Sequence, residues 1–235
     1  MLKKILVVLA VIVAGFVAFA ATRPGLYRVE RSTKIEASAS VVFAQLADFK
    51  GWAAWSPWEG KDPQMKKTYE GPAGAVGSTY AWQGNDQVGE GKMSITEVHA
   101  PTDLKLRLEF IKPFAAVAST VFIVAPDGDA TVNVTWSMDG TNNLMAKIFG
   151  IFVNMDTMIG GDFDKGLAGL KKVSEAEAKQ QAAAAAAQKA KAEAEAAAAA
   201  EKAKEEAEEA AAAAAAKEEE ESKKTKGKGK GKKKH

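Results

Sequence analysis

Hydrophobic and polar residues alternate along several short segments in the middle of the chain. The clearest is residues 104–110, LKLRLEF, in which Leu and Phe alternate with Lys, Arg and Glu. A period of two predicts a half-buried β-strand. Strands are predicted on similar grounds at residues 27–36, 65–70, 77–84, 91–98, 115–124 and 131–138, with Gly-, Pro- and Asp-rich turns between them. Together they indicate an antiparallel sheet with one apolar and one polar face.

Two other segments repeat their apolar residues at helical spacing. Residues 38–49 form the first, with Ser38 as the expected N-cap. Residues 144–173 predict one long amphipathic helix, capped by Thr141 or Asn142. Each glycine in a helix costs about 1 kcal/mol relative to alanine, so we expect some in this helix to permit close approach to the sheet or a kink around a bound molecule. The glycines concerned are Gly150, Gly160, Gly161, Gly166 and Gly169.

Three of the five tryptophans lie within FKGWAAWSPWEG, residues 49–60. Trp52, Trp55 and Trp58 are three positions apart, which places their rings on one side of a short helical segment. Each ring buries roughly 150–250 Å². At about 25 cal/mol per Å², leaving all three in water would forgo on the order of 10 kcal/mol. The rings are therefore expected to be buried, and filling the core is the simplest way to bury them.

The N-terminus is the most apolar part of the chain. Residues 5–21 are uncharged and reach the length of about 17 residues that is the lower limit for a membrane-spanning helix. We expect residues 1–23 to be a retained membrane anchor. A cleavable signal peptide is the alternative, because Ala18 and Ala20 are small residues of the kind found at a cleavage site.

The charges flanking the anchor indicate how it is oriented. Lys3 and Lys4 favour an N-terminus in the cytoplasm and a folded domain on the extracytoplasmic, periplasmic side. Arg23, Arg28 and Arg31 favour the opposite orientation, with the domain on the cytoplasmic face.

Charge also separates a folded domain from a tail. Residues 24–173 carry 15 Lys and Arg against 17 Asp and Glu, the balance of an ordinary globular domain. Residues 174–222 are Ala, Glu, Lys and Gln with a Ser at each end, which predicts a lone charged helix without a coiled-coil seam. Residues 223–235, KKTKGKGKGKKKH, predict a flexible polycation. Either this tail binds an anionic polymer or lipid surface, or it is a solubilising extension without a specific partner.

Side chains suited to catalysis are few. The absence of cysteine excludes thiol catalysis and Cys-ligated zinc, and His99 is the one histidine within residues 24–173. We expect His99 to be a solvated turn residue. P-loop, HExxH and nucleophile-elbow motifs are absent. No catalytic residue, metal site or cofactor is therefore predicted.

Several motifs carry a resemblance to a known family. They are RVERS near residue 30, WSPW at 55–58, GSTYAWQGN at 77–85, VGEGKMSITE at 88–97, VNVTWSM at 132–138 and GGDFDKGLAGLK at 160–171. With them the domain resembles the SRPBCC superfamily of START-like and Bet v 1-like proteins, and looks closest to its bacterial polyketide cyclase/dehydrase and lipid-transport-like branch. The resemblance implies an α+β helix-grip fold, a curved antiparallel sheet wrapped on a long C-terminal helix, with an apolar cavity between them.

The ligand-binding residues expected around that cavity are apolar side chains of the sheet, of the tryptophan segment and of the terminal helix. They are Trp52, Trp55, Trp58, Tyr80, Trp82, Met93, Ile95, Leu106, Leu108, Phe110, Phe122, Trp136, Met145, Phe149 and Phe152.

Two functions from different classes follow from this site. The first is a monomeric, membrane-anchored module that binds a hydrophobic small molecule or lipid. The second is a cyclase/dehydrase-like enzyme that uses the same cavity, and it requires a titratable group on the apolar face of the sheet. Because alternation places no convincing candidate there, binding is favoured. A third hypothesis makes the domain a structural head and the charged tail the working part.

Overall fold

The computed structural model describes residues 2–128, 130–152 and 154–228. The chain divides into two compact units, residues 1–179 and residues 180–235. The first unit contains the sheet and is the predicted α+β domain together with the N-terminal helix.

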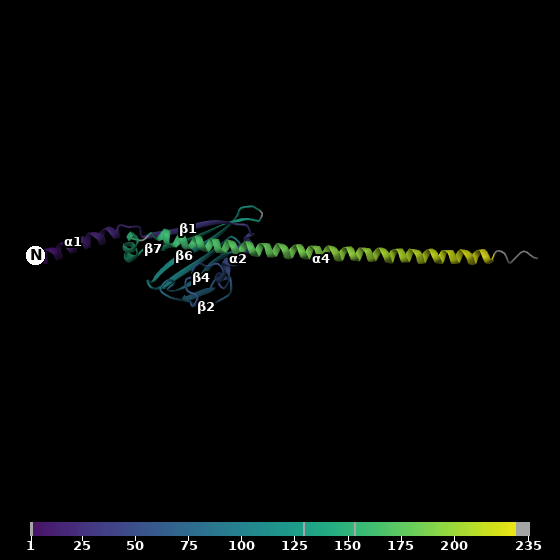
Figure 1. Ribbon diagram of the computed structural model, residues 1–235, viewed down its shortest axis with the longest axis horizontal. Helices are drawn as coiled ribbons and strands as arrows, with labels where there is room; N and C mark the ends of the chain where they lie inside the picture. The colour runs from purple at the N-terminus through teal and green to yellow at the C-terminus, as the bar shows by residue number, and fades with distance from the viewer. Residues whose placement is uncertain (1, 129, 153, 229–235) are drawn as a thin grey trace, which may run out of the picture. The chain divides into compact units, whose positions relative to one another are not determined.

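Seven antiparallel strands form one sheet in the order β1-β7-β6-β5-β4-β3-β2, so the first strand pairs with the last. This confirms the predicted antiparallel sheet, which curves around the part of α4 that belongs to this unit (Figure 1). The strands are β1 (Leu26–Ile35), β2 (Lys66–Glu70), β3 (Thr79–Gln83), β4 (Glu90–His99), β5 (Asp103–Lys112), β6 (Ala116–Pro126) and β7 (Val132–Thr141).

The helices are α1 (Leu2–Ala21), α2 (Ala39–Ala47), the 3-10 turn η1 (Gly51–Ala54), α3 (Leu144–Phe152) and α4 (Met155–Lys228). Ser38 is the N-cap residue of α2, as predicted, although its hydroxyl contacts Ser40 Oγ instead of a backbone N–H. By length and composition α1 could cross a membrane. A signal sequence has the same properties, so the retained anchor stays a prediction.

The prediction of one helix over residues 144–173 is wrong, because the helix is broken between α3 and α4. Asn143 Oδ1 accepts a hydrogen bond from Ala146 N at 2.8 Å, and Asn154 Oδ1 accepts one from Thr157 N at 3.1 Å. Each helix therefore starts at its own asparagine cap. An apolar stripe at helical spacing continues across such a break, so periodicity alone does not reveal it.

The N-cap predicted at Thr141 or Asn142 is wrong as well. Thr141 is the last residue of β7. Asn142 pairs with the segment between α1 and β1: its backbone N–H donates to Gly25 O at 2.9 Å and its Nδ2 donates to Pro24 O at 3.3 Å. These bonds join the end of β7 to the start of β1.

The core lies between the concave face of the sheet and a cover made of α2, η1 and α4. Alternate residues of the strands point into it, among them Val29, Leu106, Phe122 and Trp136, each no more than 2% exposed. Phe163 supplies part of the cover from α4 and is also 2% exposed. The strand parity read from the sequence thus identifies the buried face.

Three of the five helix glycines allow close approach. A Cβ on Gly160 would lie 2.0 Å from Arg31 Nη2, and one on Gly166 would lie 2.7 Å from Trp136 Cζ3. A Cβ on Gly169 would lie 2.6 Å from the carbonyl oxygen of Trp55. The close-approach interpretation is correct for these three. Gly150 and Gly161 face open space.

The second unit continues α4 as an Ala-rich helix. Residues 174–222, predicted to be helical, all lie within α4, so no break separates them from the domain's own helix. The helix extends to Lys228, although the Lys/Gly pattern predicts flexible chain from residue 223. Ion pairs one turn apart support the extension: Lys223 Nζ lies 2.7 Å from Glu219 and Lys224 Nζ 2.9 Å from Glu220. The rest of the predicted polycation, residues 229–235, lies outside the described residues.

Alanine at two of the α4 glycines separates packing from helix propensity. Gly169→Ala should lower the free energy of unfolding by about 1–3 kcal/mol, because the new methyl would strike the Trp55 backbone. Gly161→Ala should raise it by up to about 1 kcal/mol, because the methyl meets nothing and alanine favours the helix. Denaturant unfolding of both variants provides the measurement. Equal effects of the two substitutions would contradict the packing explanation.

Candidate functional site

An apolar strip of the concave face is only half-buried. It consists of Trp82, Met93, Leu108 and Phe110 on β3, β4 and β5, and it is called here the open floor. Met93 is paired in register with Leu108, and the rings of Trp82 and Phe110 lie 6.5 Å apart, edge to face. Each of the four retains intermediate exposure, whereas the neighbouring Ile95 and Leu106 are at most 2% exposed. The cover of helices therefore ends before the floor does.

Aromatic rings lie directly over two glycines of the concave face. A Cβ on Gly91 would lie 2.3 Å from Trp82 Cζ2, and one on Gly140 would lie 2.4 Å from Tyr27 Oη. Each ring occupies the space that a side chain on the adjacent strand would need. The lack of a side chain at Gly91 and Gly140 thus lets the rings of Trp82 and Tyr27 lie close against the sheet.

Tyr27 brings a polar group to the same face. It is paired with Gly140, which is paired with Ala118, which is paired with Leu108 of the open floor. Burial, and secondarily the nearby Asp139, raises the pKa of the Tyr27 hydroxyl above its usual value. The hydroxyl therefore keeps its proton at neutral pH, and it makes no hydrogen bond with the residues that the structure describes. The sequence prediction omitted Tyr27, although strand parity placed it on the apolar face.

The tryptophan segment packs into a cluster of buried rings behind the floor. Trp52 and Trp55 are 2% and 4% exposed, and their indole N–H groups donate to backbone carbonyls of α2, at 2.9 and 3.3 Å. Trp136 stacks on Phe163 with ring centroids 4.0 Å apart and 9° between the planes. Trp58 is half-buried and packs edge-on against both of those rings. Trp52 and Trp55 therefore fill the core, and Trp58 lies at its margin.

The fifteen predicted site residues fall into three groups by exposure. The buried group is Trp52, Trp55, Tyr80, Ile95, Leu106, Phe122 and Trp136. The half-buried group is Trp58 and the four residues of the open floor. The exposed group, on α3, is Met145, Phe149 and Phe152. The structure brings the first two groups together on one face of the sheet, and contact of any of them with a ligand stays a prediction.

Ion pairs fix the chain that follows Trp58. Lys61 Nζ lies 2.5 Å from Asp162 Oδ2 on α4, and both side chains are partly buried. Glu59 accepts hydrogen bonds from Lys67 and, at 3.4 Å, from the hydroxyl of Tyr80. Burial raises the pKa of Tyr80 well above its usual value, and Glu59 adds to this rise. The segment is thereby tied to both α4 and the β2–β3 edge of the sheet.

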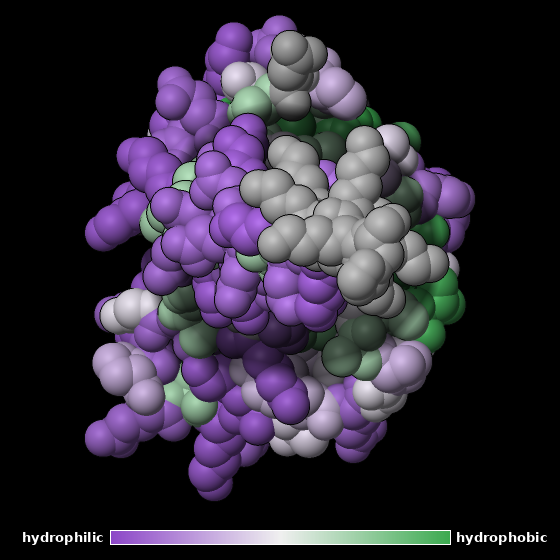
Figure 2. Space-filling model, turned by 90° about the vertical axis from the view of Figure 1, so that its right-hand side faces the viewer, coloured by the Kyte–Doolittle hydropathy of each residue, from purple (hydrophilic) through white to green (hydrophobic). Residues whose placement is uncertain are grey.

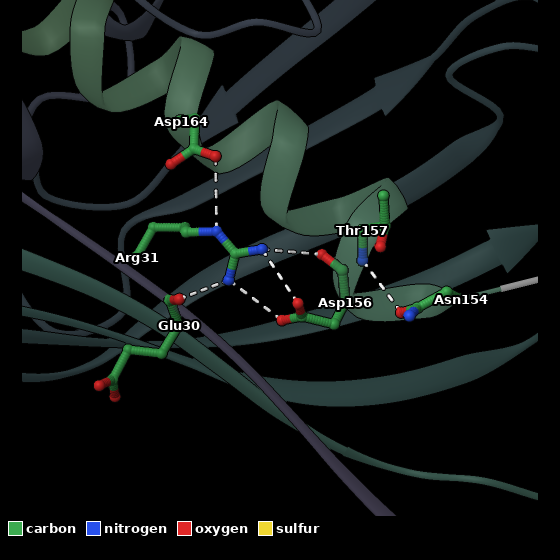
Figure 3. A network of polar contacts seen from close by, with 6 residues as sticks. All are labelled: Glu30, Arg31, Asn154, Asp156, Thr157 and Asp164. Atoms are coloured by element: carbon green, nitrogen blue, oxygen red, sulfur yellow. Dashed lines mark hydrogen bonds and ion pairs between the residues drawn. The ribbon is translucent and has the colours of Figure 1, made fainter.

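Arg31 fixes the first turns of α4 against β1 (Figure 3). Its guanidinium donates to both carboxylate oxygens of Asp156, at 3.0 and 3.1 Å, and its Nε lies 3.4 Å from Asp164 Oδ2. Gly160 leaves the room that the guanidinium occupies. Among the described residues of β1, Arg31 is the only cationic side chain on the concave face, and its charge is paired with Asp156 and Asp164. We therefore interpret this network as structural.

A hollow of about 440 Å³ opens on the outer face of the sheet. Most of its lining side chains have the outward parity of their strands, and its charged members, Arg107 and Asp139, are each ion-paired with a neighbouring side chain. Its other lining residues, Tyr27, Leu106, Ala118 and Gly140, have the inward parity of their strands. Figure 2 shows the chain from the side of its C-terminal helix, with polar side chains over most of the face and apolar side chains toward the right-hand margin.

Groups suited to metal binding are absent from the described residues, in which no three His, Cys, Asp or Glu side chains converge. His99 lies at an exposed strand end, with Nδ1 2.8 Å from Asp103 Oδ1. It is solvated, as predicted, and it is the last residue of β4.

Comparison with known proteins identifies the domain. The family model described as polyketide cyclase/dehydrase and lipid transport matches residues 27–175. The chain belongs to this family. No curated protein matches the chain significantly. This family membership accounts for the curved sheet and long C-terminal helix, and it agrees with the resemblance seen in the sequence motifs.

Solved structures resemble this family member over the domain. A protein of Chromobacterium violaceum is 13% identical, with a TM-score of 0.46, over 65% of this chain and 99% of its own. Norcoclaurine synthase of Thalictrum flavum is 14% identical, with a TM-score of 0.47, over 63% and 86%. Ginseng major latex-like protein 151 of Panax ginseng is 14% identical, with a TM-score of 0.45, over 66% and 99%. Likenesses at this level assign no function.

The Arg31 network predicts a pH dependence of stability. The Arg31 guanidinium lowers the pKa of the Asp156 carboxyl below its usual value. A depressed folded-state pKa stabilises the fold above the unfolded pKa of about 4, and this stabilisation is lost as the pH falls through the lower folded value. The wild-type chain should therefore lose more stability than Asp156→Asn when the pH is lowered from neutral to about 2.

Guanidinium chloride unfolding of both proteins at the two pH values measures the difference. The other carboxyl groups are common to both proteins, so their contributions cancel. Identical losses in the two proteins would contradict the role of the pair.

Proposed function

We propose that this chain is a membrane-anchored module that binds a hydrophobic small molecule or lipid on the open floor. The observation that carries the proposal is the partial exposure of Trp82, Met93, Leu108 and Phe110, whereas the neighbouring Ile95, Leu106 and Phe122 on the same face are buried. Contiguous exposed apolar surface in a soluble domain marks an interaction site. Membership of a family described as acting in polyketide cyclisation, dehydration and lipid transport supports an apolar ligand.

The chemistry of the floor favours a largely apolar ligand with one polar end. Its apolar and aromatic side chains would bind a ligand by removing apolar surface of both from water. The protonated hydroxyl of Tyr27 lies in the same cross-strand row and is free to donate or accept one hydrogen bond. A site of this kind orients a ligand with few polar contacts.

Enzymatic cyclisation is the less favoured function. It requires a group that takes up a proton near the reacting chain. Tyr27 and Tyr80 have raised pKa values and stay protonated, so neither is a base at neutral pH. The nearby Glu59 and Asp156 carboxylates are held in ion pairs. The polar groups around the floor are therefore suited to holding a ligand.

Helix α1 is proposed to be a retained anchor, with the domain on the periplasmic side. Its 20 residues match the thickness of a bilayer core. Lys3 and Lys4 support an N-terminus in the cytoplasm. Anchoring keeps the binding module close to the membrane, which raises the effective concentration of any lipid ligand.

Filling the space above the open floor should weaken ligand binding. Leu108→Trp would occupy the space above the sheet, and we expect at least about a tenfold loss of affinity, equivalent to about 1.4 kcal/mol. Val117→Trp is the matched control, because Val117 lies nearby on β6 and points to the outer face. The measurement is native mass spectrometry of the full chain, purified in mild detergent from its own cells, which reports any co-purifying apolar ligand and its occupancy.

Three results would decide between the functions. Occupancy that falls in Leu108→Trp and persists in Val117→Trp supports binding on the floor. Equal occupancy in both variants places the ligand elsewhere. A chain that carries no ligand but turns over an aromatic polyketide-like substrate supports the enzyme.

Removing the second unit should leave ligand binding unchanged. The chain ending at Lys179 retains the whole first unit, including every residue of the open floor. We expect the same ligand occupancy in this truncated chain and in the full chain. Loss of the ligand would favour the hypothesis that the tail is the working part.

A further inference from the structure

Exposed large apolar residues of the domain gather at one end of the sheet. By register, this end contains the start of β1, the end of β7 and the hairpin between β5 and β6, since Leu26 pairs with Thr141 and Phe110 with Ala116. Leu26 is 73% exposed and Phe114, in the hairpin, is 75% exposed. Ile111 beside it is 50% exposed.

Helix α3 adds to the same end, because it follows the last strand, β7, after two residues. Its sequence, LMAKIFGIF, contains one charged residue, and none of its side chains is fully buried. Met145, Phe149 and Phe152 are 66%, 53% and 74% exposed. A helix this apolar is ordinarily buried in a core or in a membrane.

α3 is packed against the end of α1. The rings of Phe152 and Phe16 lie 6.1 Å apart, and Lys147 Nζ donates a hydrogen bond to Ala21 O, the last carbonyl of α1, at 3.1 Å. At 1.5 Å per residue, Phe16 lies about 7.5 Å along the helix from Ala21. If α1 spans a bilayer, Phe152 therefore lies at the depth of the hydrocarbon, and Lys147 lies at the level of the headgroups.

We propose that α3 and the β5–β6 hairpin are inserted into the surface of the bilayer that α1 spans. This rests on the proposed function, in that α1 is the retained anchor. The occupant of the apolar end is lipid, because the surface is continuous with the membrane-spanning helix through the Phe16–Phe152 contact. Apolar helices with a polar margin bind in this way, with their apolar side about 5–10 Å below the headgroups.

The insertion would place the open floor toward the membrane. Phe110 lies at the end of β5 next to the hairpin, and Trp82 is one residue from the end of β3 at the same end of the sheet. A lipid could then pass between bilayer and floor without crossing water. Exposed apolar residues at the opposite end or middle of the sheet, such as Val76 and Ile123, are not part of this surface.

Depth measurements on the full chain test the insertion. The chain has no cysteine, so single cysteines can be introduced without removing others. Phe149→Cys and Phe114→Cys report on α3 and the hairpin. Val76→Cys and Ile123→Cys are matched controls, since these residues are 58% and 45% exposed. Each variant carries a fluorescent label and is reconstituted into phosphatidylcholine vesicles containing nitroxide-labelled lipid acyl chains, and circular dichroism checks its fold.

We expect the lipid nitroxides to quench the labels at residues 149 and 114 strongly and those at 76 and 123 little. Equal, weak quenching at all four positions would overturn the proposal. Self-quenching between labels at residue 149 on different molecules, without lipid quenching, would also overturn it and assign the surface to a second copy of the chain.

The proposed function is read out separately. Retention of an apolar ligand is measured by native mass spectrometry on the same labelled variants in detergent. Lipid quenching without a retained ligand would support insertion and contradict binding on the floor, and a retained ligand without quenching would do the reverse.

Discussion

The concave face of the sheet carries more apolar surface than its helices cover. The cover consists of α2, η1 and the first part of α4, and it excludes water from Phe122 and Trp136 but not from Leu108 or Phe110. Uncovered apolar area costs about 25 cal/mol per Å² relative to burial. Most of this uncovered apolar area lies toward one end of the sheet, and the candidate site, the anchor and the apolar helix α3 all belong to that end.

Small residues set how closely the covering elements approach. Gly166 and Gly169 let α4 touch the ring of Trp136 and the backbone of Trp55, which closes the core completely on that side. Gly91 and Gly140 act on the sheet itself, because they let the rings of Trp82 and Tyr27 lie close to the neighbouring strand. Glycines therefore allow close packing of α4 on one part of the concave face and close packing of aromatic rings on the sheet in the other.

Alternation along residues 104–110 was enough to predict β5 and to decide which of its side chains are inside, because a strand has only two faces. The same parity found Trp82 and Met93 but could not rank them against Ile95, since exposure depends on where the helices end. The break before α4 escaped prediction because Asn154 caps a helix whose apolar stripe continues across it. Tyr27 was missed as a polar contact because its importance comes from Gly140, a residue more than a hundred positions away that is brought beside it by strand pairing.

The position of the open end relative to α1 follows from topology. β1 begins five residues after α1 ends, and it pairs with β7, which leads directly into α3. Any antiparallel sheet whose first strand pairs with its last places the start of the first strand and the end of the last strand together. Because the cover formed by α4 starts only after α3, the strands next to this end lack a helix above them. Apolar surface left uncovered by the late start of α4 thus lies beside α1, a helix that by length and composition could cross a bilayer, so one environment can remove both from water.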